Sequence, residues 1–169
     1  MLPKINTILY TTGLGEGAPH VFRYALSLAQ AHQAKIAIVH AMEPLSPFGQ
    51  SLVELHITHE KSEQMHKQAQ ERVKGDIVKR LELLCEKELC NDPEGRSRVT
   101  DILVDEGHPP LVILEEAKRL KADLIVMGTH RHTRLGEALL GNTAQKVIHS
   151  STTPVLLVRI PEGFHEEGF

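Results

Sequence analysis

A glycine at the start of a predicted helix is the feature of this sequence best suited to ligand binding. Gly141-Asn142-Thr143 follows a polar loop and opens that helix. The first N–H groups of a helix have no partner within the helix and lie at the positive end of its dipole, so they favour a phosphate group. A glycine turn with an ordinary Asn or Thr N-cap would show the same residues. The pattern therefore leaves open a phosphate site and a purely structural helix start.

Three segments at the ends of predicted strands should lie close to this helix start. They comprise residues 11–17, 39–43 and 127–143. In an open parallel sheet, ligands bind at the carboxyl ends of the strands, where the winding direction reverses. We therefore expect a ligand pocket at this edge of the sheet.

Histidines are the second group of residues with chemical potential. His56, His59, Glu63 and His66 are separated by three, four and three residues, which places them on one face of a helix. This face could hold a metal or make a pH-sensitive contact, but metal sites usually take ligands from more than one element, so we expect a solvated or dimer-facing stripe and no metal. His40 lies within an apolar strand and is expected to be a core residue.

The sequence carries no recognisable catalytic motif. The patterns GxxxxGK[ST], GxGxxG and GxSxG are all absent. No nucleophile–base pair is identifiable from the spacing of the residues. We therefore expect a binding protein, or at most a slow ATPase.

The elements that position these residues alternate between strands and helices. Continuous apolar runs predict strands, and apolar residues at three- and four-residue steps predict helices. The predicted strands cover residues 5–12, 35–41, 98–105, 123–127 and 154–159, and the predicted helices cover residues 18–32, 55–90, 109–120 and 141–148. Residues 42–52 are expected to form a loop and residues 91–95 a turn, because both contain proline and glycine.

This alternation predicts an α/β fold: an open five-stranded parallel sheet with helices on both faces. The strands are mostly apolar throughout, which suits a sheet covered on both sides. The long helix over residues 55–90 contains Gly75, where it could bend or break. We expect a single domain over residues 1–160, followed by a flexible tail over residues 161–169.

Composition and charge argue against nucleic acid and membranes as partners. Lys and Arg (19) do not outnumber Asp and Glu (22), and aromatic residues make up only 4%, so we expect no nucleic-acid partner. No apolar run approaches the roughly 18 residues that span a bilayer, so we expect no membrane association. Cys85 and Cys90 match neither a zinc site nor a redox pair, and are expected to be inert helix residues. Free thiols without a signal-peptide pattern predict a cytoplasmic protein.

Several motifs in this order resemble the universal stress proteins of the UspA-like family. The similar segments are residues 8–12, 25–29, 104–109, 127–130 and 136–159. The resemblance covers nearly the whole chain. It implies a Rossmann-like sheet with strand order 3-2-1-4-5, and a homodimer joined through the last strand at Pro154–Arg159.

ATP-binding members of that family carry the pattern G-x2-G-x9-G-[ST]. Here Gly128 and Gly141 match, whereas Arg131 stands at the second glycine and Asn142 at the Ser/Thr position. Gly13 occupies the position of a common aspartate, and losing that acceptor costs about 1–2 kcal/mol, or roughly tenfold in affinity. Arg131 could either crowd the phosphate or clamp it with its guanidinium.

The resemblance implies a stress-response factor that binds an adenine nucleotide, ATP or AMP with Mg²⁺, at the carboxyl ends of the first and fourth strands. The implied nucleotide-binding residues are Thr11, Thr12, Gly13, Ala41, Met127, Gly128, Arg131, Gly141, Asn142 and Thr143. The alternative is a dimeric interaction module with a degenerate ATP site. That module would use the long helix over residues 55–90 to hold a protein partner.

Overall fold

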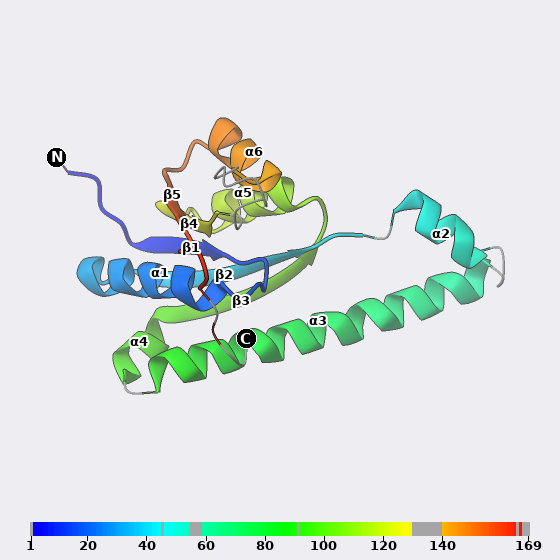
Figure 1. Ribbon diagram of the computed structural model, residues 1–169, viewed down its shortest axis with the longest axis horizontal. Helices are drawn as coiled ribbons and strands as arrows, with labels where there is room; N and C mark the ends of the chain where they lie inside the picture. Colours follow the sequence, from blue (N-terminus) through cyan, green and yellow to red (C-terminus); the bar gives the residue numbers. More distant parts are fainter. Residues whose placement is uncertain are drawn as a thin grey trace.

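Five parallel strands form the central sheet, in the order β3-β2-β1-β4-β5 (Figure 1). The computed structural model describes residues 2–44, 46–54, 59–90, 92–129, 140–164 and 166. The strands are β1 (Thr7–Thr11), β2 (Lys35–Met42), β3 (Val99–Glu106), β4 (Leu124–Gly128) and β5 (Val155–Val158). The predicted α/β class and strand order are therefore confirmed.

The sheet is covered on both faces, as its apolar strands predicted. Alternate strand residues point to opposite sides, so Ile8 and Tyr10 pack on one face while Leu9 packs on the other. The first face is covered by α1 (Ala18–His32) and the C-terminal half of α3 (His59–Leu89). The second is covered by α5 (Pro109–Arg119) and α6 (Asn142–Ser150).

Two short helices lie where the sequence predicted a loop and a turn. The loop prediction for residues 42–52 was wrong, because α2 (Pro47–Glu54) begins within it. The turn prediction for residues 91–95 was also wrong, because α4 (Pro93–Arg98) begins there. Ser46 Oγ accepts a hydrogen bond from Gly49 N at 3.1 Å, and an Asp92 carboxylate oxygen accepts one from Gly95 N at 2.8 Å. Both helices thus start with an N-cap residue followed by proline at the first helical position.

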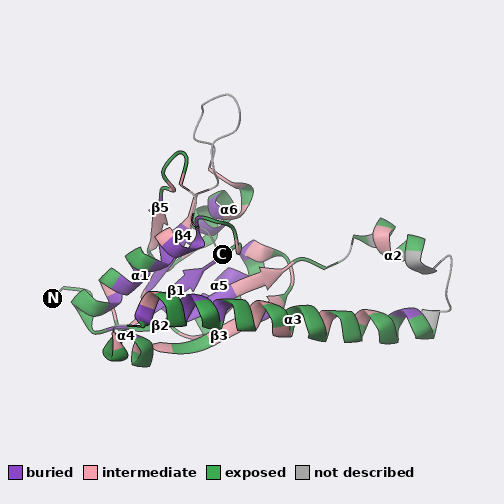
Figure 2. Cartoon of the chain, turned by 60° about the horizontal axis from the view of Figure 1, so that its bottom comes forward, coloured by how far each residue is buried: buried purple, intermediate pink, exposed green. Residues whose placement is uncertain are grey.

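The long helix α3 is continuous through Gly75, but only its C-terminal half packs on the sheet. Leu81, Leu84 and Cys85 are fully buried, whereas Met65 and Val73 remain about half exposed. Figures 1 and 2 show α2 and the N-terminal half of α3 extending to one side of the sheet. Residues 55–58, where the helix was predicted to begin, lie outside the described residues.

The end of the chain contacts α1 and α3. Glu166 forms ion pairs with Arg23 at 2.7 Å and Lys87 at 3.4 Å, and the Phe164 ring lies 5.2 Å from that of His20. Within the described parts of the chain, no helix is both long enough and apolar enough to cross a membrane.

Candidate nucleotide pocket

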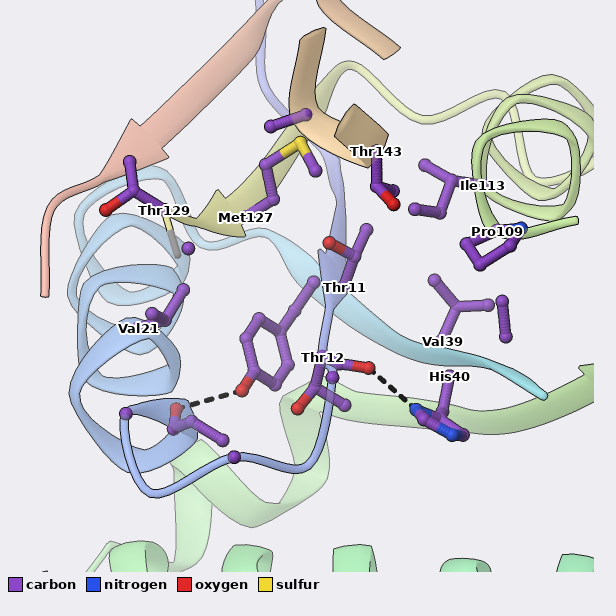
Figure 3. Close-up of a pocket in the computed structure, with 18 of the residues that line it drawn as sticks. Thr11, Thr12, Val21, Val39, His40, Pro109, Ile113, Met127, Thr129 and Thr143 are labelled. Atoms are coloured by element: carbon purple, nitrogen blue, oxygen red, sulfur yellow. Dashed lines mark hydrogen bonds between the residues drawn. The ribbon is translucent and has the colours of Figure 1, made fainter. Parts of the chain in front are cut away.

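A pocket of about 270 Å³ lies at the carboxyl ends of β1, β2 and β4 (Figure 3). The chain leaves β1 through α1 toward β2 on one side, and enters β4 on the other side through α5. The pocket therefore lies at the topological switch point, where open α/β sheets bind ligands. Its lining comprises Tyr10, Thr11, Thr12, Gly13, Gly15, Gly17, Ala18, Val21, Val39, His40, Ala41, Pro109, Ile113, Met127, Gly128, Thr129, Thr143, Ala144 and Ile160.

Most of the residues predicted for the nucleotide site come together in this pocket. Those in its lining are Thr11, Thr12, Gly13, Ala41, Met127, Gly128 and Thr143. Gly141 and Asn142 stand at the start of α6 beside the pocket but are not part of its lining. Arg131 lies outside the described residues, so the choice between crowding and clamping stays a prediction.

His40 is not the core residue that the sequence predicted. It is half-buried and lines the pocket, and its Nδ1 lies 2.8 Å from the carbonyl oxygen of Thr12. The reason is the length of the strands: β1 pairs with β2 only as far as Thr11 opposite Val39. His40 therefore lies beyond the end of β1, at the edge of the sheet.

Three helices begin at the pocket, because Ala18, Pro109 and Thr143 belong to its lining. None of the three has a hydrogen-bonded side-chain cap or an acidic residue in its first turn. The positive ends of three helix dipoles thus converge on one cavity without a compensating negative charge from these helices.

Most of the free backbone N–H groups at these three helix starts belong to α6. The first turn of α5 opens with Pro109 and Pro110, which have no N–H group. In α6, Gln145 N donates to Gly141 O at 3.0 Å and makes the first helical hydrogen bond. The N–H groups before it, from Asn142 to Ala144, are the donors that a helix start leaves unpaired.

The charge of the pocket favours an anion. No residue in its described lining carries a carboxylate. Next to the lining residue Pro109, Nε2 of His108 lies 3.2 Å from the ammonium nitrogen of Lys146 on α6. Because an ammonium only donates, Nε2 of His108 accepts, and the Lys146 charge has no carboxylate partner among the described residues.

Two glycines of the pocket permit close packing, whereas the other two, Gly13 and Gly15, leave open space. A Cβ at Gly17 would lie 2.4 Å from Ile160, and one at Gly128 would lie 2.8 Å from Val21. A Cβ at Gly13 would meet no atom within 4 Å. Gly13 thus leaves room in the pocket where the resemblance implied a missing aspartate.

The histidine face of α3 forms no metal site in the described part of the chain. His56 and the side chain of His59 lie outside the described residues. Nε2 of His66 lies 2.9 Å from the side-chain nitrogen of Gln70, which also donates to Glu106 at the end of β3. No group of three or more His, Cys, Asp or Glu residues able to hold a metal occurs among the described residues.

The two cysteines have different surroundings. Cys85 is fully buried against the sheet, and burial raises the pKa of its thiol to about 11. Cys90 is exposed just after the end of α3. The sequence predicted that both are inert helix residues, whereas Cys90 lies just beyond the last residue of α3, Leu89, and is open to solvent.

The set of nucleotide-binding residues predicted from the sequence omits several residues of the pocket lining, although the predicted strand-end segments 39–43 and 127–143 contain two of them, Val39 and Thr129. Val39 and Ile113 add aliphatic surface, and Thr129 adds a hydroxyl after β4. Val39 could have been included in that set, because it precedes Ala41 by two residues and so points to the same face of the strand. No local signal marks Ile113, which reaches the pocket from α5 through tertiary packing.

The family model and a related sequence both match this chain to the same protein family. The model of the universal stress protein family matches residues 4–159. A universal stress protein from Thermus aquaticus, encoded in the 3′ region of QAH/OAS sulfhydrylase, is 32% identical over 159 residues. That match covers 91% of this chain and 98% of the relative.

Solved structures share the fold. The structure of protein MJ0577 superposes with a TM-score of 0.70 at 24% identity, and covers 93% of this chain and 97% of that one. A universal stress protein solved in complex with cAMP gives a TM-score of 0.55 at 23% identity, and covers 94% of this chain and 100% of that one.

Proposed function

The chain belongs to the universal stress protein family, and from this premise we propose that it is a stress-response factor that binds an adenine nucleotide at the carboxyl ends of β1 and β4. The observation that carries the proposal is the convergence of three helix starts without side-chain caps on a pocket whose described lining has no carboxylate. Such a cavity attracts an anion with an apolar body, and a nucleotide has both parts.

The phosphate groups would bind at the start of α6. The N–H groups from Asn142 to Ala144 supply donors there, and the Thr143 hydroxyl lines the same wall. Lys146 lies one turn further along α6 and adds a positive charge beside His108. If Mg²⁺ accompanies ATP, its ligands would be phosphate oxygens and water, because the described lining supplies no carboxylate.

The nucleoside would lie against the aliphatic side of the pocket. Val39, Ala41, Ile113 and Met127 form this side, and Thr11 places a hydroxyl among them. A flat base gains hydrophobic burial there, while a nearby hydroxyl can pair with its polar edge. The cAMP complex of a structural neighbour supports an adenine nucleotide as the ligand class.

Replacing one of two alanines by tryptophan tests the location of the site. Ala41→Trp should fill the nucleoside side and weaken AMP binding by about tenfold or more. Ala31→Trp, at an exposed position of α1, is the matched control and should bind AMP as the wild type does. Equal affinity of both variants and the wild type would place the site elsewhere.

We also propose that the chain forms a homodimer through β5. This strand is at the edge of the sheet, and Val155, Leu156 and Leu157 are only half-buried. An edge strand with unpaired backbone groups and apolar side chains is a ready surface for association. The resemblance implies the same contact.

A protein-binding role for α3 is the second candidate function. The observation that favours it is the half of α3 that extends past the sheet with Met65 and Val73 exposed (Figure 2). The double variant Met65→Glu and Val73→Glu should release a bound partner and leave AMP affinity unchanged. A partner retained equally by the variant and the wild type would rule out this surface.

A further inference from the structure

Thr12 is held at each of its polar atoms. Its backbone N donates to Val39 O at 3.0 Å, and its Oγ1 accepts from Leu14 N at 3.1 Å. Its carbonyl oxygen lies 2.8 Å from Nδ1 of His40, a contact that Figure 3 shows directly. The residue as a whole is also buried, with 9% of its surface exposed.

The contact fixes which ring nitrogen of His40 carries the proton. A carbonyl oxygen only accepts hydrogen bonds, so Nδ1 must be the donor. The neutral ring is therefore the Nδ1–H tautomer, and the protonated ring keeps the same donor. His40 can hold the Thr12 carbonyl in both states.

The segment after Thr12 needs such an anchor. Gly13, Gly15 and Gly17 fall within five residues, and glycine has the greatest conformational freedom of any residue. Leu14 between them has a φ of 59°, a left-handed conformation that non-glycine residues adopt rarely. At its far end the loop is tied to α1 by the bond from Ala18 N to Gly15 O, at 2.9 Å. At its near end the loop is held to the sheet by the hydrogen bonds of Thr12 with Val39 and His40.

We propose that His40 is a positioning residue for the pocket: its Nδ1–H holds the Thr12 carbonyl and fixes the glycine-rich loop over residues 12–17 in the conformation that receives the ligand. This role deepens the proposed function and rests on it for the choice of nucleotide. The loop lines the pocket directly, so a change in its conformation alters the cavity.

Two variants of His40 distinguish the effect of its hydrogen-bond donor from the effect of its side-chain size. In His40→Asn, the side-chain nitrogen occupies nearly the position of Nδ1 and can still donate to Thr12. In His40→Leu, a methyl group takes that position and leaves the carbonyl without its partner. The Leu variant should bind AMP about 3- to 10-fold more weakly than the wild type, and the Asn variant within about twofold of it. Equal losses in both variants, or no loss in either, would overturn the positioning role.

Measurements without ligand keep this test independent of nucleotide binding. Ring ¹⁵N spectra of the wild type at neutral pH should show the proton of His40 on Nδ1, and a proton on Nε2 alone would overturn the proposal. Amide exchange at Leu14 should accelerate in His40→Leu and stay near the wild-type rate in His40→Asn, and equal rates in both variants would contradict it. Should the wild type bind neither AMP nor ATP, the proposed function fails, while these two measurements still decide the role of His40.

Discussion

Gly13 is a position where the pocket has room for an added interaction. The resemblance implies an aspartate here, and the structure leaves space for one, since a Cβ at Gly13 meets no atom within 4 Å. Gly13→Asp should restore an acceptor for the nucleoside and raise adenosine affinity about tenfold. Titration calorimetry with adenosine, which carries no phosphate to be repelled, measures this change.

Gly13→Ala is the matched control for that substitution. It adds the Cβ without the carboxylate and should leave adenosine affinity within about twofold of the wild type. Unchanged or weaker binding by Gly13→Asp would show that this position does not face the nucleoside.

The cysteines give a second prediction at the scale of single residues. At neutral pH the Cys85 thiol stays protonated, because burial raises its pKa to about 11, and the side chain has no exposed surface. Cys90 is exposed and should be the thiol that reacts with a disulfide reagent in the folded protein. A colorimetric assay should count one thiol per folded chain and two after denaturation. Two rapidly reacting thiols in the folded protein would contradict the packing of α3.

Ligands of an open parallel sheet bind at the carboxyl ends of its strands, and this rule explains which site residues could be predicted from sequence. It identifies residues at strand ends, and this is why Thr11, Ala41 and Met127 were found. The predicted segment 39–43 includes His40, but the sequence placed this residue in the core, because an apolar run looks the same whether a residue lies in the middle of a sheet or beyond the end of its neighbour. The end of β1 at Thr11 decides that question, and it becomes visible only when the strands are paired.

At the scale of elements, the sheet and its main helices were predicted because their apolar periodicity is strong. The two helices that were missed, α2 and α4, share one cause. Ser46-Pro47 and Asp92-Pro93 were interpreted as turn residues, whereas both pairs are an N-cap with proline at the first helical position. A capping residue before proline is ambiguous in sequence, since turns use the same pair.

The cap of α4 predicts a pH dependence of stability. The Gly95 N–H and then the Gln30 side chain donate to Asp92 and lower the pKa of its carboxyl group in the folded state. A lowered pKa stabilises the fold above the ordinary aspartate value, about 3.9, and this contribution is lost as pH falls through the folded-state pKa. Asp92→Asn keeps a capping oxygen that does not titrate.

The wild type should therefore melt at a higher temperature than Asp92→Asn at pH 7. This difference should shrink toward zero as the pH falls below the ordinary aspartate pKa of about 3.9 and through the lower folded-state pKa. Thermal unfolding across that pH range is the measurement. A difference that stays constant with pH would exclude the charged cap as its source.

At the scale of the whole molecule, the edge position of β5 predicts association. One chain has a mass of 18.8 kDa, so light scattering should give twice that value at micromolar concentration. Val155→Lys places a charge on the half-buried edge and should shift the protein toward the monomer. Lys35→Arg, on a different strand, is a control that should remain dimeric. A wild-type mass equal to one chain would contradict the proposed dimer.

Binding of an adenine nucleotide in the pocket at the ends of β1 and β4 is the function we propose. Calorimetric titration of nucleotide-free protein with ATP and Mg²⁺, repeated with AMP, is the first measurement to make. We expect a dissociation constant below about 100 μM, or roughly −5.5 kcal/mol, because the helix starts and Lys146 favour the phosphate. No heat at millimolar nucleotide, from protein shown to be folded, would contradict the claim and leave the interaction surface of α3 as the function to pursue.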